Sequence, residues 1–115
     1  MTELISTVSG LDQDGFAVVS NPEFLREGSA IDDYYNPPFI VLASDNKLGI
    51  QTSRKLYSDI TSKIVETSIE VAEMIKYVNN TFHALKVAFA NEIGDICKKL
   101  GLDSHELMDV FILDT

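Results

Sequence analysis

The feature that most constrains the fold is a long stretch of helical periodicity at residues 68–100. Its apolar residues recur at helical spacing, and Gly101 follows as a C-terminal cap. Across residues 77–91 the only charged residue is Lys86. A helix that is apolar nearly all round has to be covered on several sides. We therefore expect a long helix that is buried on more than one face.

Two faces of this helix differ in chemistry. At about 100° per residue, one broad face collects the residues that a core would use: Met74, Val78, Phe82, Leu85, Phe89, Ile93, Ile96 and Leu100. On the other side, within an arc of roughly 80°, lie four polar residues among small ones: Lys76, Asn80, His83 and Asn91. A solvated face would more usually carry Glu, Lys and Gln. We expect a ligand, a second copy of the chain, or both, to approach this side.

The residues before the long helix have the pattern of an α/β sheet edge. Two short apolar runs bounded by turn residues predict buried strands, and a later alternation of apolar and polar residues predicts a third. Two helices are predicted between them, the first with Pro22 in its first turn. The predicted elements are strands at residues 16–20, 39–43 and 62–67 and helices at residues 23–33 and 48–59.

The expected division is an α/β edge at residues 1–67 and a helical part at residues 68–115, mainly α overall. A second helix is predicted after the long one, with Ser104 as its cap. With 115 residues, the chain has room for a modest core and not for a complete two-domain enzyme.

Glu23 and Glu27 lie four residues apart, just beyond the first predicted strand. Open α/β sheets bind ligands at the carboxyl ends of their strands, and a four-residue spacing would point both carboxylates into that crevice. From spacing alone, a commoner explanation is two acids that serve a helix dipole, with Arg26 as a local counter-charge.

Composition and charge exclude several classes of partner. A net charge of −9, with only nine Lys and Arg residues, leaves no basic stripe for nucleic acid and no polybasic arm for an anionic membrane. No apolar run approaches membrane-helix length, and no signal peptide is visible, so we expect a cytoplasmic protein. The single cysteine, Cys97, cannot form an internal disulfide, and no Cys/His spacing suggests a metal site.

Two motifs carry a resemblance to a known family: NPEFLREGSAI at residues 21–31 and AEMIKYVNNTFHALKVAFANEIGDICKKLG at residues 72–101. Both resemble the UDP-glucose/GDP-mannose dehydrogenases, NAD-dependent enzymes that oxidise the C6 hydroxyl of a nucleotide sugar to a carboxylate in two steps. The second motif is more similar to the branch that oxidises GDP-mannose to GDP-mannuronate than to the UDP-glucose branch.

The resemblance implies the last part of an NAD-binding Rossmann domain, followed by the start of a central helical domain whose long helix builds a homodimer. The family's Gly-x-Gly-x-x-Gly loop and its Gly-Gly-Ser-Cys nucleophile motif do not occur in the sequence. We therefore expect an internal fragment of such an enzyme, without dehydrogenase activity of its own.

The resemblance also assigns catalytic roles. Glu23 would perform acid/base work, notably activation of water to hydrolyse a thioester, and burial would raise its pKa toward a working value. Lys76 and Asn80 would lie beside the reacting C6 carbon, where an ammonium and an amide can stabilise an alkoxide or a tetrahedral intermediate. A lysine of this kind is otherwise more often a solvated surface residue.

Binding roles follow in the same way. Glu27 would contact both substrate and NAD, and Phe24 and Leu25 would offer backbone groups to the substrate. His83 and Asn91 match positions that contact the sugar or nucleotide in the GDP-mannose branch. The competing hypothesis is a non-catalytic helical dimerisation module, in which the polar side of the long helix is only a dimer seam.

Overall fold

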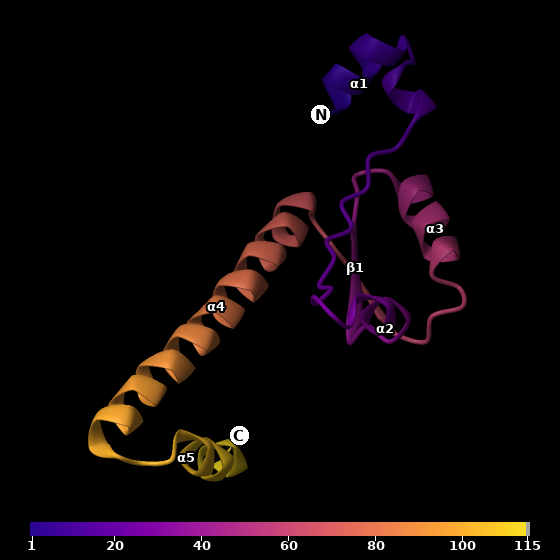
Figure 1. Cartoon of the computed structure of the whole chain (residues 1–115). Coiled ribbons are helices and arrows are strands. Elements are labelled where there is room, and N and C mark those ends of the chain that lie inside the picture. The colour runs from indigo at the N-terminus through magenta and orange to yellow at the C-terminus, as the bar shows by residue number, and fades with distance from the viewer. Residues whose placement is uncertain (115) are drawn as a thin grey trace. The chain divides into compact units, whose positions relative to one another are not determined.

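The computed structural model describes residues 1–114, apart from the side chain of Gln13, and divides them into two compact units, Met1–Val78 and Asn79–Thr115. The chain is mainly helical, with a two-stranded sheet in the first unit (Figure 1). The elements are α1 (Thr2–Ser9), a 3-10 turn (Gln13–Gly15), α2 (Ala30–Tyr35), β1 (Phe39–Ala43), α3 (Lys47–Leu56), β2 (Lys63–Thr67), α4 (Ile69–Leu100), α5 (Ser104–Phe111) and a 3-10 turn (Ile112–Asp114). The predicted class, an α/β edge followed by a long helix, is confirmed.

β1 and β2 pair in parallel, with Val41 opposite Val65. α3 connects them, as a parallel pair requires. β1 is buried from Ile40 to Ala43, which explains why its sequence is a continuous apolar run. The strands predicted at residues 39–43 and 62–67 are therefore confirmed, the second starting one residue later than expected.

The strand predicted at residues 16–20 does not form. Only Ser20 pairs with β1, through two antiparallel hydrogen bonds to Ala43 of 2.8 and 2.9 Å. The pairing stops there because the Asn21 side chain donates to the carbonyl of Val41 at 2.8 Å, and Pro22 has no N–H to offer. The predicted burial of this run is not observed either, because Ala17 is exposed and the other residues of the run are only partly buried.

The helix predicted at residues 23–33 is also wrong, because α2 begins only at Ala30. The backbone N–H groups of Leu25 and Arg26 bind the carboxylates of Glu23 and Asp33 instead of helical carbonyls. Gly28 has a φ of +85°, which a right-handed helix does not allow. Glu23 and Glu27 therefore do not share a turn of helix.

The core of the first unit lies between the sheet and the start of α4. Val41, Ala43 and Ala72 form its buried centre. Phe24, Phe39 and Ile69 pack against that centre and are themselves partly buried. The segment that carries the paired glutamates is thus anchored to the sheet through Phe24.

The second unit holds the rest of α4 and all of α5. Gly101 follows α4 with a φ of +69°, and the N–H of Leu102 binds the carbonyl of Cys97 at 3.0 Å, as expected of a glycine cap. The N-cap of α5 is Asp103 rather than the predicted Ser104: its carboxylate accepts from the backbone N–H of His105 at 2.8 Å.

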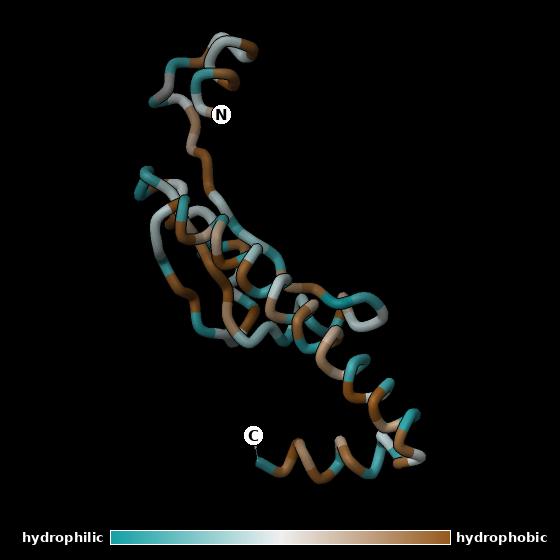
Figure 2. The backbone as a smooth tube through the Cα atoms, turned by 90° about the vertical axis from the view of Figure 1, so that its left-hand side faces the viewer, coloured by the Kyte–Doolittle hydropathy of each residue, from teal (hydrophilic) through white to brown (hydrophobic). Residues whose placement is uncertain are grey.

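Most of the apolar face of α4 is exposed in the second unit, although the Phe89 ring packs against Phe111 of α5. In the second unit Phe82, Leu85 and Leu100 remain 59, 62 and 67% exposed. Apolar residues recur along both helices of this unit (Figure 2). The expected burial on several sides is therefore absent from residues 79–114 taken alone. None of the helices in the described chain is long and apolar enough to cross a membrane.

Candidate active site

Two of the predicted site residues meet in the first unit. The Nζ atom of Lys76, on α4, donates to the Oε1 atom of Glu23 at 2.5 Å and to the backbone carbonyl oxygen of Glu23 at 2.5 Å. The two residues are 53 positions apart in the sequence. The Phe24 ring lies below the same ammonium, with its centroid 5.8 Å from Nζ. The fold thus brings a carboxylate and an ammonium together at the first of the two motifs.

The segment before Glu23 is fixed to the sheet and to α3. Asn21 donates from its amide to the carbonyl of Val41, and its amide oxygen accepts from the hydroxyl of Tyr57. Burial raises the pKa of Tyr57, so its hydroxyl keeps the proton that this bond needs. With Pro22 restricting the next residue, the backbone reaches Glu23 on a defined path.

The segment after Glu23 is fixed by Asp33. This carboxylate accepts hydrogen bonds from the backbone N–H of Arg26 at 2.9 Å and from the Arg26 guanidinium at 2.6 and 3.1 Å. The hydroxyl of Ser29 donates to it at 3.0 Å. The Arg26 guanidinium holds the pKa of Asp33 well below its usual range, so that it stays ionised.

Lys76 lowers the pKa of Glu23, and the N–H of Leu25, 2.7 Å from Oε2, lowers it further. The expectation that burial raises this pKa is wrong for this structure, because the Glu23 side chain is 58% exposed. Its carboxylate is therefore ionised at neutral pH. In that state it can accept a proton and cannot donate one.

Two other predicted residues, Phe24 and Leu25, adjoin this pair through the ring and the N–H described above. Glu27 lies exposed in the turn before α2 and makes no hydrogen bond within the described chain. Asn80, His83 and Asn91 are exposed on the part of α4 that belongs to the second unit. The structure thus joins Glu23 and Lys76 and leaves the other side chains available.

Sequence reasoning missed three residues that build this site: Asn21, Asp33 and Tyr57. Asn21 precedes a proline and could have been noticed as a turn residue. Asp33 and Tyr57 gave no signal, since each acts through a side-chain bond to a loop whose path the sequence does not reveal.

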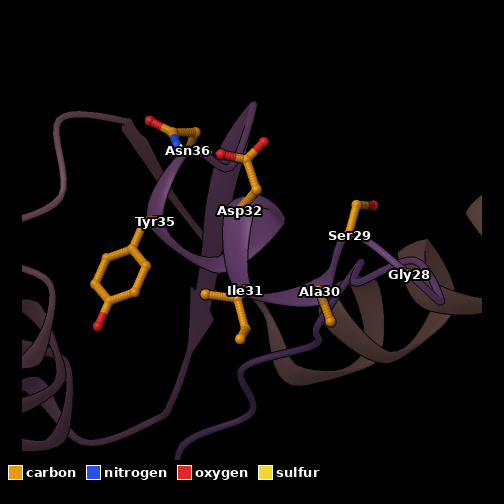
Figure 3. A pocket seen from close by; sticks show the side chains of 7 residues that line it. All are labelled: Gly28, Ser29, Ala30, Ile31, Asp32, Tyr35 and Asn36. Carbon is orange, nitrogen blue, oxygen red and sulfur yellow. Dashed lines mark hydrogen bonds between the residues drawn. The ribbon is translucent and has the colours of Figure 1, made fainter.

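An open hollow lies beside the loop, at the start of α2. Its walls are Gly28, Ser29, Ala30, Ile31, Asp32, Tyr35 and Asn36 (Figure 3). None of the predicted site residues lines it. The hollow is therefore not the place where Glu23 and Lys76 would act.

The residues present fit only part of an NAD molecule. Exposed carboxylates such as Glu27 are suitable acceptors for ribose hydroxyls, whereas the pyrophosphate needs a glycine-rich turn that the sequence does not contain. Within residues 1–114 no group of three His, Cys, Asp or Glu side chains is arranged to hold a metal ion.

Comparison with known proteins gives two family matches. Residues 1–61 match the NAD binding domain of the UDP-glucose/GDP-mannose dehydrogenase family, and residues 70–115 match the central domain of the same family. The cofactor expected from the sequence, NAD, is that of the matched domain.

Individual relatives agree with these matches. GDP-mannose 6-dehydrogenase from Pseudomonas savastanoi pv. phaseolicola is 48% identical over 99 residues, covering 86% of this chain and 23% of the relative. UDP-glucose 6-dehydrogenase AglM from Haloferax volcanii is 40% identical over 107 residues, covering 89% and 25%. The crystal structure of a ternary complex of GDP-mannose dehydrogenase from Pseudomonas aeruginosa superposes with a TM-score of 0.89 at 44% identity, covering 97% and 26%. The chain thus spans about a quarter of the length of the relatives it matches.

Proposed function

Since the chain belongs to the UDP-glucose/GDP-mannose dehydrogenase family, we propose that it forms part of the active site of an NAD-dependent nucleotide-sugar 6-dehydrogenase. The substrate would be GDP-mannose, oxidised to GDP-mannuronate in two hydride transfers, in the cytoplasm. The observation that carries this proposal is the contact between Lys76 and Glu23, which brings together one residue from each of the two family motifs, 53 positions apart in the sequence.

Lys76 has the capacity for one more hydrogen bond in this arrangement. An ammonium carries three N–H donors, and two of them are used by the oxygens of Glu23. The third can bind an oxygen of the reacting sugar carbon, where a fixed positive charge stabilises developing negative charge. Asn80, four residues later on α4, would add an amide donor to the same oxygen.

Glu23 would act as a base while Lys76 keeps it ionised. A carboxylate held in this state can take a proton from a water molecule that attacks a thioester. NAD, when bound, accepts the hydride removed from the sugar carbon. Glu27 would bind hydroxyls of the cofactor and the sugar, and the backbone of Phe24 and Leu25 would bind the substrate.

We propose GDP-mannose rather than UDP-glucose as the substrate, because this chain is 48% identical to the GDP-mannose relative and 40% identical to the UDP-glucose relative. His83 and Asn91 are the side chains proposed to contact the sugar or nucleotide. Both are exposed and so are free to do this. UDP-glucose remains the alternative substrate.

A homodimer through α4 would cover its apolar face. Phe82, Leu85 and Leu100 are each more than half exposed in the single chain, which is costly for side chains of this size. A second copy would bury them. The competing hypothesis, a dimerisation module without a catalytic role, predicts the same dimer and no function for the Glu23–Lys76 pair.

The test is a chimera in which this chain replaces the matching quarter of the Pseudomonas aeruginosa GDP-mannose dehydrogenase. We expect it to form NADH from GDP-mannose and NAD, with UDP-glucose as the poorer substrate. A folded, dimeric chimera without activity on either sugar would contradict the proposal. The 115-residue chain by itself is expected to be inactive, and NADH formation by the pure chain would refute that expectation.

A further inference from the structure

Asp33 binds both the backbone and the side chain of Arg26, in the loop before α2. One of its carboxylate oxygens, Oδ2, accepts the backbone N–H of Arg26 at 2.9 Å, and both oxygens accept from the guanidinium of the same residue. The Asp33 side chain is only 11% exposed, whereas that of Arg26 is 70% exposed. The carboxylate is thus the fixed partner, and the loop is attached to it.

The Arg26 N–H that binds Asp33 directly follows, along the backbone, the Leu25 N–H that binds Glu23. Two successive backbone N–H groups are bound by carboxylates: that of Leu25 by Glu23 at 2.7 Å, and that of Arg26 by Asp33 at 2.9 Å. These N–H groups belong to consecutive planar peptide units joined at the Cα of Leu25, so that with the second unit held, the first can turn only through the φ and ψ angles of Leu25. The orientation of the Leu25 N–H in turn holds the Glu23 carboxylate, whose other oxygen faces Lys76.

We propose that Asp33 is a positioning residue that holds the loop at residues 23–26 in the conformation in which the Glu23 carboxylate meets Lys76. It does so through the peptide N–H of Arg26, with the Arg26 guanidinium and the Ser29 hydroxyl completing its hydrogen bonds. Asp33 itself touches neither Lys76 nor Glu23 among the hydrogen bonds of the described chain. The inference rests on the proposed function only for the role of Glu23.

The direction in which the pKa of Glu23 changes when Asp33 is replaced separates a positioning role from a simple charge effect. Replacing Asp33 by Asn removes a negative charge and leaves the Arg26 guanidinium unpaired, and both changes by themselves lower the pKa of a nearby carboxylate. Loss of positioning acts in the opposite direction. If the Leu25 N–H and Lys76 no longer meet Glu23, the causes of its lowered pKa weaken and that pKa rises.

The experiment is a titration of the Glu23 carboxyl carbon by NMR in the isotopically labelled chain, in the unsubstituted protein and in Asp33→Asn. The matched control is Asp32→Asn, which removes the same charge from the same helix. Asp32 accepts only a bond from the amide of Asn36, at 2.9 Å, among the side-chain bonds of the described residues. We expect the pKa of Glu23 to rise in Asp33→Asn and not in Asp32→Asn. A fall or no change in Asp33→Asn would overturn the proposal.

Asp33→Asn could also lose its fold, so a second measurement uses the unsubstituted chain. A scalar coupling transmitted through the hydrogen bond is expected between the amide nitrogen of Arg26 and the carboxyl carbon of Asp33. Absence of that coupling, with other backbone couplings visible, would overturn the proposal without any substitution. Neither measurement involves turnover, so an inactive chimera would count against the proposed function and leave the role of Asp33 intact.

Discussion

Lys76 binds both the carboxylate and the backbone carbonyl of Glu23, so that the start of α4 and the loop before α2 are joined at one ammonium. The carboxylate contact depends on charge and can be removed by pH or substitution. The carbonyl contact does not depend on the Glu23 side chain. This difference allows the contribution of the carboxylate to be measured alone.

The first prediction concerns the pH dependence of stability. Lys76 lowers the pKa of Glu23 from its ordinary value of 4.5 in the folded chain. The folded state therefore binds fewer protons than the unfolded state, and the stabilisation is present above pH 4.5 and is lost as the pH falls through the folded pKa. Glu23→Gln should lower the free energy of unfolding by about 1 kcal/mol or less above that pH, since the pair is partly exposed.

Urea denaturation of both proteins above and below pH 4.5 measures this difference. Other carboxylates with lowered pKa values, such as Asp33, are common to both proteins and cancel in the comparison. We expect the two free energies to converge at low pH. An equal gap at every pH would show that the lost stability comes from packing rather than from the ion pair.

The second prediction concerns the packing of α3. A Cβ atom added at Gly49 would lie 2.9 Å from the Cβ of Ala17 and 3.0 Å from the Cγ2 of Val19. Gly49→Ala should therefore destabilise the chain by about 1–3 kcal/mol, because the buried backbone would have to move. The matched control is Gly94→Ala on α4, where a Cβ meets nothing within 4 Å.

Gly94→Ala should stabilise the chain by up to about 1 kcal/mol, because alanine favours the interior of a helix. Thermal unfolding followed by circular dichroism compares the two variants. Equal effects would mean that the segment at residues 17–19 does not pack against α3 in solution.

The third prediction concerns association. Leu85 is 62% exposed on the apolar face of α4, and a homodimer would bury it. Leu85→Glu should raise the dissociation constant at least about tenfold, which corresponds to about 1.4 kcal/mol. Leu48→Glu is the control, since Leu48 is 69% exposed on α3 and lies outside the proposed interface. Sedimentation velocity at several concentrations measures both, and an unsubstituted chain that stays monomeric at high concentration would contradict the homodimer.

The sequence predicted the elements whose pattern is set locally. β1 is an apolar run between turn residues, and α4 has a long helical period that stops at a glycine, so both were found nearly to the residue. The helix expected at residues 23–33 failed because Asp33 and Glu23 take the backbone donors that a helix would use. Such competition depends on where the side chains lie in space, which periodicity does not contain.

The site was predictable only in part, because its motif residues are visible in the sequence and their surroundings in space are not. The motifs identified Glu23 and Lys76, and the structure brings them together. The motif does not predict the direction of the Glu23 pKa shift, because the side chain is exposed rather than buried and the fold places a cation beside it. The division of the chain at residues 67 and 68 stays a prediction, as do the roles of Asn80, His83 and Asn91.

The most direct test of the central claim, that Lys76 belongs to an active site with Glu23, is turnover of the chimera carrying Lys76→Ala. Lys86→Ala is the control, since it removes the same charge from the same helix in the second unit, where the ammonium lies 5.0 Å from the Phe82 ring centroid. We expect kcat for NADH formation from GDP-mannose to fall about 100-fold or more in Lys76→Ala, with the dimer intact and Lys86→Ala unaffected. Unchanged kcat together with weakened association would contradict the claim and favour a dimerisation module.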